Sequence, residues 1–202
     1  MHERLRLHPE RPQKRQIERA ADLLRQGCFA VVPTETTYAL MALPGSTEAQ
    51  EAIRRVRKLD ERHLWALACL DLSQAANYSR IDNSAHRLLR RCLPGPYTFI
   101  LPASSTLPKR IFGKRRDIGI RMPEAIICRA LLEQLGEPLL TTSCQLPGME
   151  VATDPDLLES QLKGYKYVLL DAGWGGTVPT TVVDLCCEEP ELFRQGAGEW
   201  PA

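Results

Sequence analysis

The segment that decides the fold is FAVVPTETTY, residues 29–38. It begins with a short apolar run, and a run of this length next to polar residues predicts a buried strand over 29–33. Hydroxyl side chains follow at once, from Thr34 to Tyr38. Ligands of α/β proteins gather beyond the ends of strands. The segment therefore predicts a buried strand that leads into a ligand-binding loop.

Helical and strand patterns alternate on both sides of this segment. A helix is predicted over 14–26, because apolar residues recur at helical spacing and Gly27 fits the position just past its end. A second helix is predicted over 47–58, with Thr47 and Gln50 spaced for a capping box. Further helices are predicted over 83–92, 124–135 and 155–163, and further strands over 65–70, 97–101, 118–121, 139–142, 167–170, 181–185 and 191–194.

This alternation predicts an α/β fold, with a twisted sheet flanked by helices. Closer strand spacing after residue 165 indicates that part of the sheet is antiparallel, so the sheet is mixed. We expect a single domain over 14–202, because no linker long enough to separate two domains occurs. Residues 1–13 are polar and basic, and we expect them to form a flexible N-terminal arm.

Composition excludes several classes of protein. The 202 residues are 44% hydrophobic and 25% charged, as in ordinary globular domains. No apolar run approaches the roughly 20 residues of a membrane span, and the N-terminus lacks a signal-peptide core. We therefore expect a cytoplasmic protein with no membrane partner. The seven cysteines form no Cys-x-x-Cys pair and the four histidines no catalytic pattern, so neither a metal site nor a catalytic side chain is assigned.

Polar and basic side chains cluster at the ends of the predicted strands. A single threonine there is explained by the β propensity of its branched side chain. Together, however, hydroxyls and arginines can bind phosphate or carboxylate oxygens, which predicts a cleft for an anionic ligand, either a nucleotide or RNA. The residues concerned are Thr34, Thr36, Thr37, Arg121, Thr141, Thr142, Ser143, Thr180, Thr181 and Arg194.

Basic residues are concentrated in the middle of the chain, although the net charge is only +1. One group lies on the predicted second helix, a second over 87–91 and a third over 109–121. Such groups can contact the phosphates of a nucleic acid. An ordinary solvated helix face explains Arg87, Arg90 and Arg91 equally well.

Five spaced segments resemble those of YrdC-type proteins over roughly residues 14–200. They are PTETTY at 33–38, PGPYTFIL at 94–101, GIRMP at 119–123, TTVVD at 180–184 and RQGAG at 194–198. The YciO subgroup is the most similar, because Leu146-Pro147-Gly148 follows the serine strand and Arg57-Lys58-Leu59 replaces the Lys-x-Arg of the family's enzymes. Gln145 likewise replaces the asparagine of the family's Ser-x-Asn.

The resemblance implies a fold with a basic concave cleft and two possible functions. Enzymes of the family join threonine, bicarbonate and ATP, with Mg²⁺, into threonylcarbamoyl-adenylate for the t6A modification of tRNA. The alternative is a non-catalytic module that binds tRNA or double-stranded RNA.

The resemblance also assigns binding residues to each ligand. The ATP and phosphate residues would be Arg57, Lys58, Thr142, Ser143, Gln145 and Arg194. The threonine residues would be Thr34, Thr37, Arg121 and Thr180. The RNA residues would be Arg54, Arg87, Arg90 and Arg91. Restoring an arginine at position 59 is expected to strengthen ATP binding.

Overall fold

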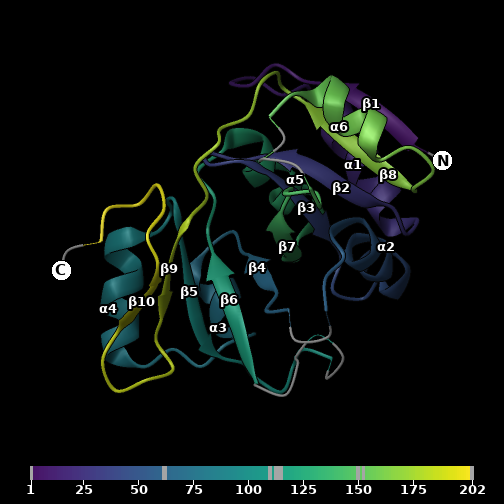
Figure 1. Cartoon of the computed structure of the whole chain (residues 1–202). Helices are drawn as coiled ribbons and strands as arrows, with labels where there is room; N and C mark the ends of the chain where they lie inside the picture. Colours follow the sequence, from purple (N-terminus) through teal and green to yellow (C-terminus); the bar gives the residue numbers. More distant parts are fainter. Residues whose placement is uncertain are drawn as a thin grey trace.

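A computed structural model describes residues 2–60, 63–108, 111, 116–148, 151 and 153–200. Within these residues the chain forms a ten-stranded mixed sheet, in the order β1-β8-β2-β3-β7-β4-β6-β5-β9-β10 (Figure 1). The strands are β1 His2–Arg6, β2 Phe29–Pro33, β3 Tyr38–Ala42, β4 Ala66–Ala68, β5 Tyr97–Pro102, β6 Asp117–Arg121, β7 Leu139–Ser143, β8 Tyr167–Asp171, β9 Thr181–Asp184 and β10 Glu191–Arg194. The α/β fold with a mixed sheet, predicted from the sequence, is confirmed.

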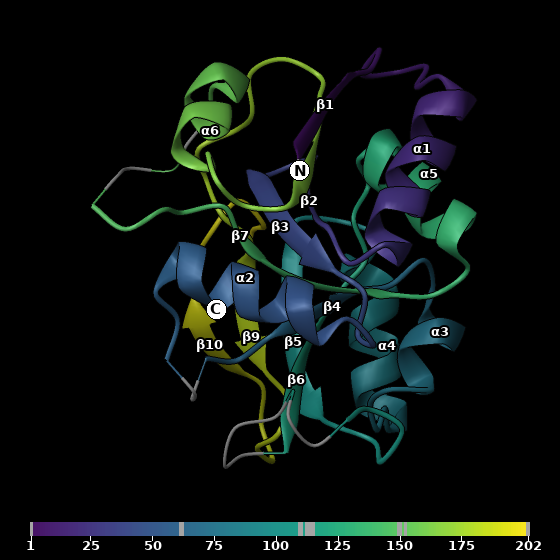
Figure 2. The same cartoon turned by 90° about the vertical axis from the view of Figure 1, so that its right-hand side faces the viewer.

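Helices cover the two faces of the sheet unequally. The helices are α1 Lys14–Arg25, α2 Thr47–Arg57, α3 Leu72–Ala76, α4 Asn83–Cys92, α5 Ile126–Leu135 and α6 Pro155–Gln161. Figure 2 shows the helices around the twisted sheet; the buried residues of α1 and α5 belong to the hydrophobic cluster of one face, and those of α2, α3, α4 and α6 to the cluster of the other. On the first face, α1 and α5 pack near β2 and β8. The described helices on that face leave β4, β6, β5 and β9 uncovered.

The antiparallel part of the sheet is larger than the sequence predicts. β2 turns back into β3, which pairs with β7, and β7 pairs with β4, all antiparallel. β3 was not predicted as a strand; its five residues are buried, and a continuous apolar run of this kind fits a buried strand and a buried helix segment equally well. The hairpin places residues 34–37 at its turn, next to the end of β7.

The expectation of a flexible arm over residues 1–13 is wrong. Residues 2–6 form β1, which pairs in parallel with β8. Leu5 and Leu7 are buried against α1, and Arg4 donates to the Asp171 carboxylate at 2.8 Å. β1 lies at the edge of the sheet and buries only one of its five residues, so most of its residues are polar. A polar segment without an apolar pattern was therefore predicted to be flexible.

Helix ends follow their local sequence with one correction. α1 ends as predicted before Gly27, whose φ of +87° lies in the left-handed region that favours glycine. α2 is capped by Ser46 rather than Thr47, because the Ser46 hydroxyl accepts a hydrogen bond from the Ala49 N–H at 3.3 Å. Gln50 instead donates to the carbonyls of residues 43 and 44. The short α3 was not predicted from the sequence.

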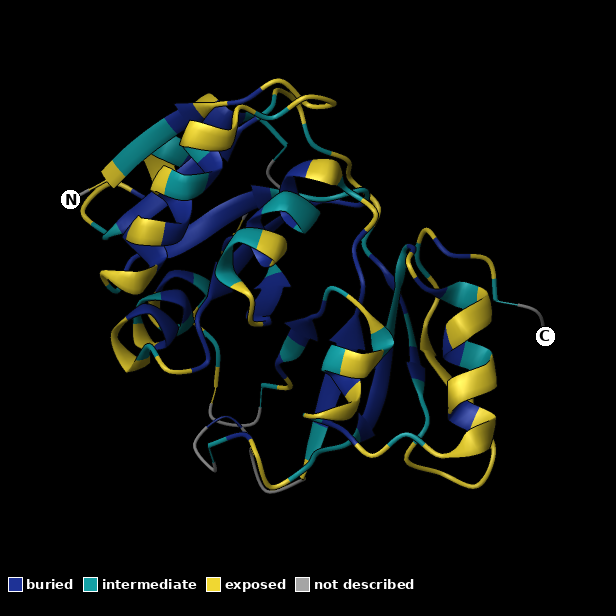
Figure 3. Cartoon of the chain, turned by 180° about the vertical axis from the view of Figure 1, so that it is seen from behind, coloured by how far each residue is buried: buried dark blue, intermediate teal, exposed yellow. Residues whose placement is uncertain are grey.

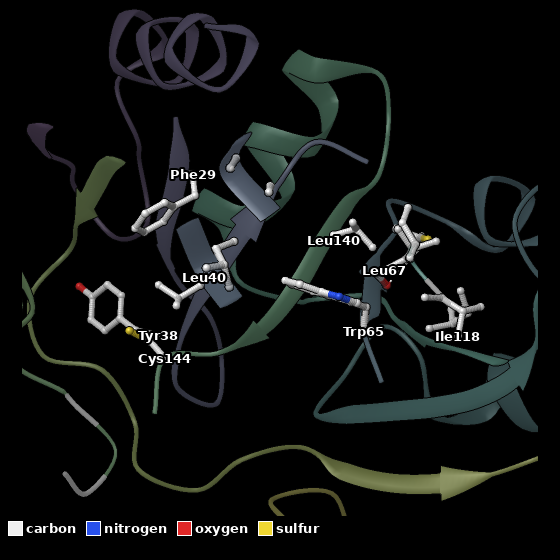
Figure 4. Close-up of a cluster of buried hydrophobic side chains, with 14 of the residues drawn as sticks. Phe29, Tyr38, Leu40, Trp65, Leu67, Ile118, Leu140 and Cys144 are labelled. Carbon is white, nitrogen blue, oxygen red and sulfur yellow. Dashed lines mark hydrogen bonds between the residues drawn. The ribbon is translucent and has the colours of Figure 1, made fainter. Parts of the chain in front are cut away.

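Buried side chains join the two halves of the sheet into one body. Figure 4 shows Leu40, Leu140, Leu67 and Ile118 on successive strands, with Trp65 between the halves. Trp65 is 1% exposed and belongs to the larger hydrophobic cluster. α4 packs on the same cluster and turns buried residues toward the strands and exposed residues outward (Figure 3). None of the helices in the described ranges is long and apolar enough to cross a membrane.

Candidate functional site

A cavity of about 470 Å³ opens over β4, β6, β5 and β9, on the face of the sheet that α1 and α5 leave uncovered there. Its floor crosses several strands, because Thr141 of β7 pairs with Ala66 of β4, which pairs with Gly119 of β6. A side chain on Gly119 would bring its Cβ within 2.9 Å of the Ala66 Cβ. Gly119 therefore leaves space that a larger side chain would fill. We call this cavity the cleft.

The loop between β2 and β3 forms one wall of the cleft. Thr36 and Thr37 line it, as the sequence predicts for Thr37. Thr34 does not belong to its lining. The Thr34 hydroxyl instead donates to the Thr37 carbonyl at 2.6 Å and accepts from the N–H groups of Thr36 and Thr37 at 3.3 Å. Thr34 therefore holds the loop in shape, and it lines a separate cavity of about 400 Å³ with Trp174 and Ile126.

A nearly buried ion pair fixes this loop to the sheet. Arg121 donates to the Glu35 carboxylate at 2.8 Å, and the side chains are 8% and 14% exposed. The other oxygen of Glu35 accepts from the N–H groups of Glu124 and Ala125, just before α5. Arg121 lines the cleft as predicted, but its charge is balanced by Glu35. Glu35 lies inside the PTETTY segment, and its role in fixing the loop was not predicted from the sequence.

Only one of the two expected cations of α2 reaches the cleft. Arg57 lines it and donates to the backbone carbonyl of Gln145. Burial lowers the pKa of Arg57, and no described carboxylate forms an ion pair with it. Lys58 ends the helix with a φ of 51°, and its exposed side chain lies outside the lining. The structure therefore places Lys58 away from the cleft in which the phosphates were expected, and Leu59 packs against the hydrophobic core.

The far end of the cleft is formed by β9 and β10. Arg194 donates to the Thr180 carbonyl from Nε at 3.2 Å and from a terminal nitrogen at 2.9 Å. The Thr180 hydroxyl is in turn 2.9 Å from that of Thr98. Burial lowers the pKa of Arg194, which has no carboxylate partner among the described residues. The end of β7 contributes the predicted Thr142, Ser143 and Gln145 to the lining.

Two aromatic side chains in the cleft were not predicted. His63 and Trp65 both line it, with ring centroids 5.6 Å apart. Burial and then the charges of Arg57 and Arg54 lower the pKa of His63 to about 4, so its ring is neutral at pH 7. No sequence pattern marked His63, because its position depends on how residues after α2 turn back to the sheet.

Unsatisfied polar atoms are concentrated at this one place. Among the described side chains, four buried polar atoms lack a hydrogen-bond partner: Arg57 Nε, His63 Nε2, Arg121 Nε and Thr141 Oγ1. All four residues line the cleft. Buried polar groups in proteins are nearly always paired, and exceptions point to function or to an additional partner such as water. The free-energy cost of burying polar atoms without hydrogen bonds is therefore concentrated, among the described residues, in the cleft.

None of the four residues expected to bind RNA lines the cleft, and Arg54 on α2 lies apart from the other three on α4. Arg87, Arg90 and Arg91 are exposed on α4, on the other side of the sheet. The Arg54 guanidinium lies over the Trp65 ring, 5.6 Å from its centroid, and donates to the Asp60 carbonyl. In the third basic group, Lys109, Arg110, Lys114 and Arg115 lie outside the described residues.

Comparison with known proteins agrees with this fold. The family model Sua5_yciO_yrdC, described as telomere recombination, matches residues 22–196. The uncharacterized protein YciO of Escherichia coli K12 is 41% identical over 195 residues, which are 96% of this chain and 95% of that protein. The crystal structure of E. coli YciO has a TM-score of 0.94 at 40% identity, over 98% of both chains.

More distant relatives have a named activity. A threonylcarbamoyl-AMP synthase of Bacillus subtilis is 30% identical over 90% of this chain, which spans about half of that enzyme's length (53%). The crystal structure of Pyrococcus abyssi Sua5 complexed with L-threonine has a TM-score of 0.87 at 28% identity, over 97% of this chain and 57% of that one. The matched segment, the fold and the relatives together identify the chain as a member of the Sua5/YciO/YrdC family.

Proposed function

We propose that this protein catalyses a threonylcarbamoyl-AMP synthase-type reaction, in which threonine, bicarbonate and ATP give threonylcarbamoyl-adenylate and pyrophosphate. The product would serve the t6A modification of tRNA. The observation that carries the proposal is the cleft itself, which combines two arginines without carboxylate partners, several hydroxyl groups at strand ends and four unpaired buried polar atoms. The names of the B. subtilis and P. abyssi relatives support the reaction class.

The reaction needs positioning and charge neutralisation rather than a nucleophilic side chain. The threonine amine attacks the carbon of bicarbonate and gives a carbamate with loss of water. A carbamate oxygen then attacks the α-phosphorus of ATP, and pyrophosphate leaves. Arg57 and Arg194 would neutralise the phosphates from opposite ends of the cleft, and Thr37, Arg121 and Thr180 would hold threonine. Preorganised donors of this kind supply much of the rate enhancement of many enzymes.

Magnesium would enter with the nucleotide. The described lining of the cleft contains hydroxyls, amides and arginines but no carboxylate. Mg²⁺ keeps several water ligands and commonly binds through substrate phosphates. The residues of the cleft therefore fit a metal carried by the triphosphate, with Ser143 and Thr142 as nearby hydroxyl groups.

We expect turnover to be slow. The enzymes that the chain resembles have two cations where this chain has Arg57 and the core residue Leu59. Loss of one preorganised charge costs about 3 kcal/mol of transition-state stabilisation in comparable sites. The reaction would then run at about a hundredth of the usual rate.

Omission of single substrates tests the proposal. Pyrophosphate release from ATP is measured with threonine and bicarbonate together and with each left out in turn. The proposal requires release that depends on both, with threonylcarbamoyl-adenylate detected by mass spectrometry. ATP hydrolysis that ignores threonine, or no release at all with saturating substrates, would contradict it.

The second candidate function is binding of tRNA or double-stranded RNA without catalysis. It is favoured by the exposure of Arg87, Arg90 and Arg91 along one helix, since neighbouring cations can follow a phosphate backbone. Replacing all three with glutamine should weaken binding and flatten its dependence on salt. An unchanged salt slope in the triple variant would remove α4 from any RNA interface.

A further inference from the structure

An irregularity in β10 turns two consecutive side chains toward the cleft. The pairing of β10 with β9 shifts between Leu192 and Arg194, so Phe193 is the extra residue of a β-bulge. Successive side chains of a regular strand point to opposite faces, and a bulge re-aims one of them. Phe193 and Arg194 consequently both line the cleft.

Phe193 is an exposed aromatic side chain with no partner ring. It is 74% exposed, and the described aromatic residues make no ring contact with it. Among the described residues, Phe193 and Trp174 are the aromatic members of the exposed large apolar side chains, and of these two Phe193 lines the cleft. The ring therefore offers a flat apolar surface to a ligand in the cleft.

The surroundings of Phe193 suit a base attached to phosphate. Ile100 and Val182 provide apolar surface at this end of the cleft. Arg194 follows Phe193 directly, and the hydrogen bonds to the Thr180 carbonyl fix its guanidinium without neutralising it. A planar apolar ring next to an uncompensated cation matches a nucleotide, which has a planar base and an anionic phosphate.

We propose that Phe193 is a stacking platform for the base of a mononucleotide whose phosphate is bound by Arg194. This inference rests on the proposed nucleotide site and deepens it, because it assigns the base to the β10 end of the cleft. Stacking recognises the π face that every base has. Phe193 would therefore strengthen the binding of any nucleoside triphosphate and would not select adenine.

The test compares ligands with and without a base. Calorimetry measures the binding of MgATP, MgGTP and inorganic tripolyphosphate to the wild type, Phe193→Leu and Phe193→Trp. Leu192→Ala is the matched control, because Leu192 precedes Phe193 on the same edge strand and lies outside the cleft lining. Thermal denaturation verifies that each variant is folded, which the high exposure of Phe193 favours.

The expected pattern separates stacking from phosphate binding. Phe193→Leu should weaken ATP and GTP by about fivefold or more, with tripolyphosphate unchanged, since base–aromatic stacking is worth about 1–3 kcal/mol. Phe193→Trp and Leu192→Ala should bind all three ligands like the wild type. Equal losses for ATP and tripolyphosphate, or no loss for ATP in a folded Phe193→Leu, would overturn the inference.

Two further outcomes identify other causes. If the wild type binds tripolyphosphate but ATP no better, the phosphate site stands and the base platform is wrong. If neither ligand binds, the proposed function itself fails, and this inference with it. A single-stranded RNA oligonucleotide that loses affinity in Phe193→Leu while ATP does not would assign the ring to RNA and overturn the mononucleotide proposal.

Discussion

Replacing Arg57 with glutamine should weaken ATP binding without weakening the fold. Arg57 lies in the last turn of α2, lines the cleft and has no carboxylate partner among the described residues. Its Nε is buried without a hydrogen bond, and burial lowers the pKa of the guanidinium. Burying this unpaired positive charge therefore destabilises the ligand-free protein, and a bound anion would offset that destabilisation.

The size of the effect follows from the lost contact. A hydrogen bond to a charged group contributes about 1.5–3 kcal/mol, so the Kd for ATP should rise by about 10- to 150-fold. The melting temperature of the ligand-free variant should be unchanged or higher, because a partly buried unpaired charge is removed. Calorimetric titration of MgATP and differential scanning calorimetry measure the two effects.

The matched control is Arg55→Gln. Arg55 lies on the same turn of α2, is exposed and does not line the cleft. This variant removes the same charge, so it corrects for the general loss of positive potential. Equal losses of ATP affinity in the two variants, or none in Arg57→Gln, would refute the assignment of Arg57 to the phosphates.

Three further changes test other parts of the site. Leu59→Arg should lower the melting temperature, because Leu59 packs against the core; a stable variant with stronger ATP binding would restore the expectation from the sequence. Glu35→Gln should lower the free energy of unfolding by about 2–4 kcal/mol, as measured in urea, because it leaves the nearly buried Arg121 without its ion-pair partner. The control Glu124→Gln, at an exposed position, should change the free energy of unfolding little. His63 has a pKa near 4 in the folded state, below the ordinary value of about 6.5, so the unfolded state binds a proton first as pH falls. Stability should therefore fall between about pH 6.5 and pH 4, and His63→Asn should reduce that fall; an identical pH profile in the variant would contradict this.

Much of the site could be predicted because its residues stand directly after strands. Ser143 ends β7, Gln145 follows it and Arg121 ends β6, so correct strand ends identified these residues. β6 and β7 are antiparallel, so only the sheet order brings both ends to one cleft. The errors have a common origin. Thr34 and Lys58 belong to the right segments, but the direction of each side chain depends on a local turn. The Thr34 hydroxyl is used within its own loop, and the left-handed backbone at Lys58 ends α2.

The sequence by itself determined which segments form most strands and helices and which loops carry polar groups, because apolar periodicity and helix-end residues act over a few neighbours. Only the tertiary structure decided the strand order, which places Thr98 opposite Val182 and Val182 opposite Arg194 in one row across three strands. It also decided that a polar N-terminal segment becomes β1 and that a bulge turns Phe193 into the cleft. These outcomes depend on pairing between residues that are far apart in the chain. The free energy of such pairing depends on both partners, and the local sequence of one segment does not specify its partner.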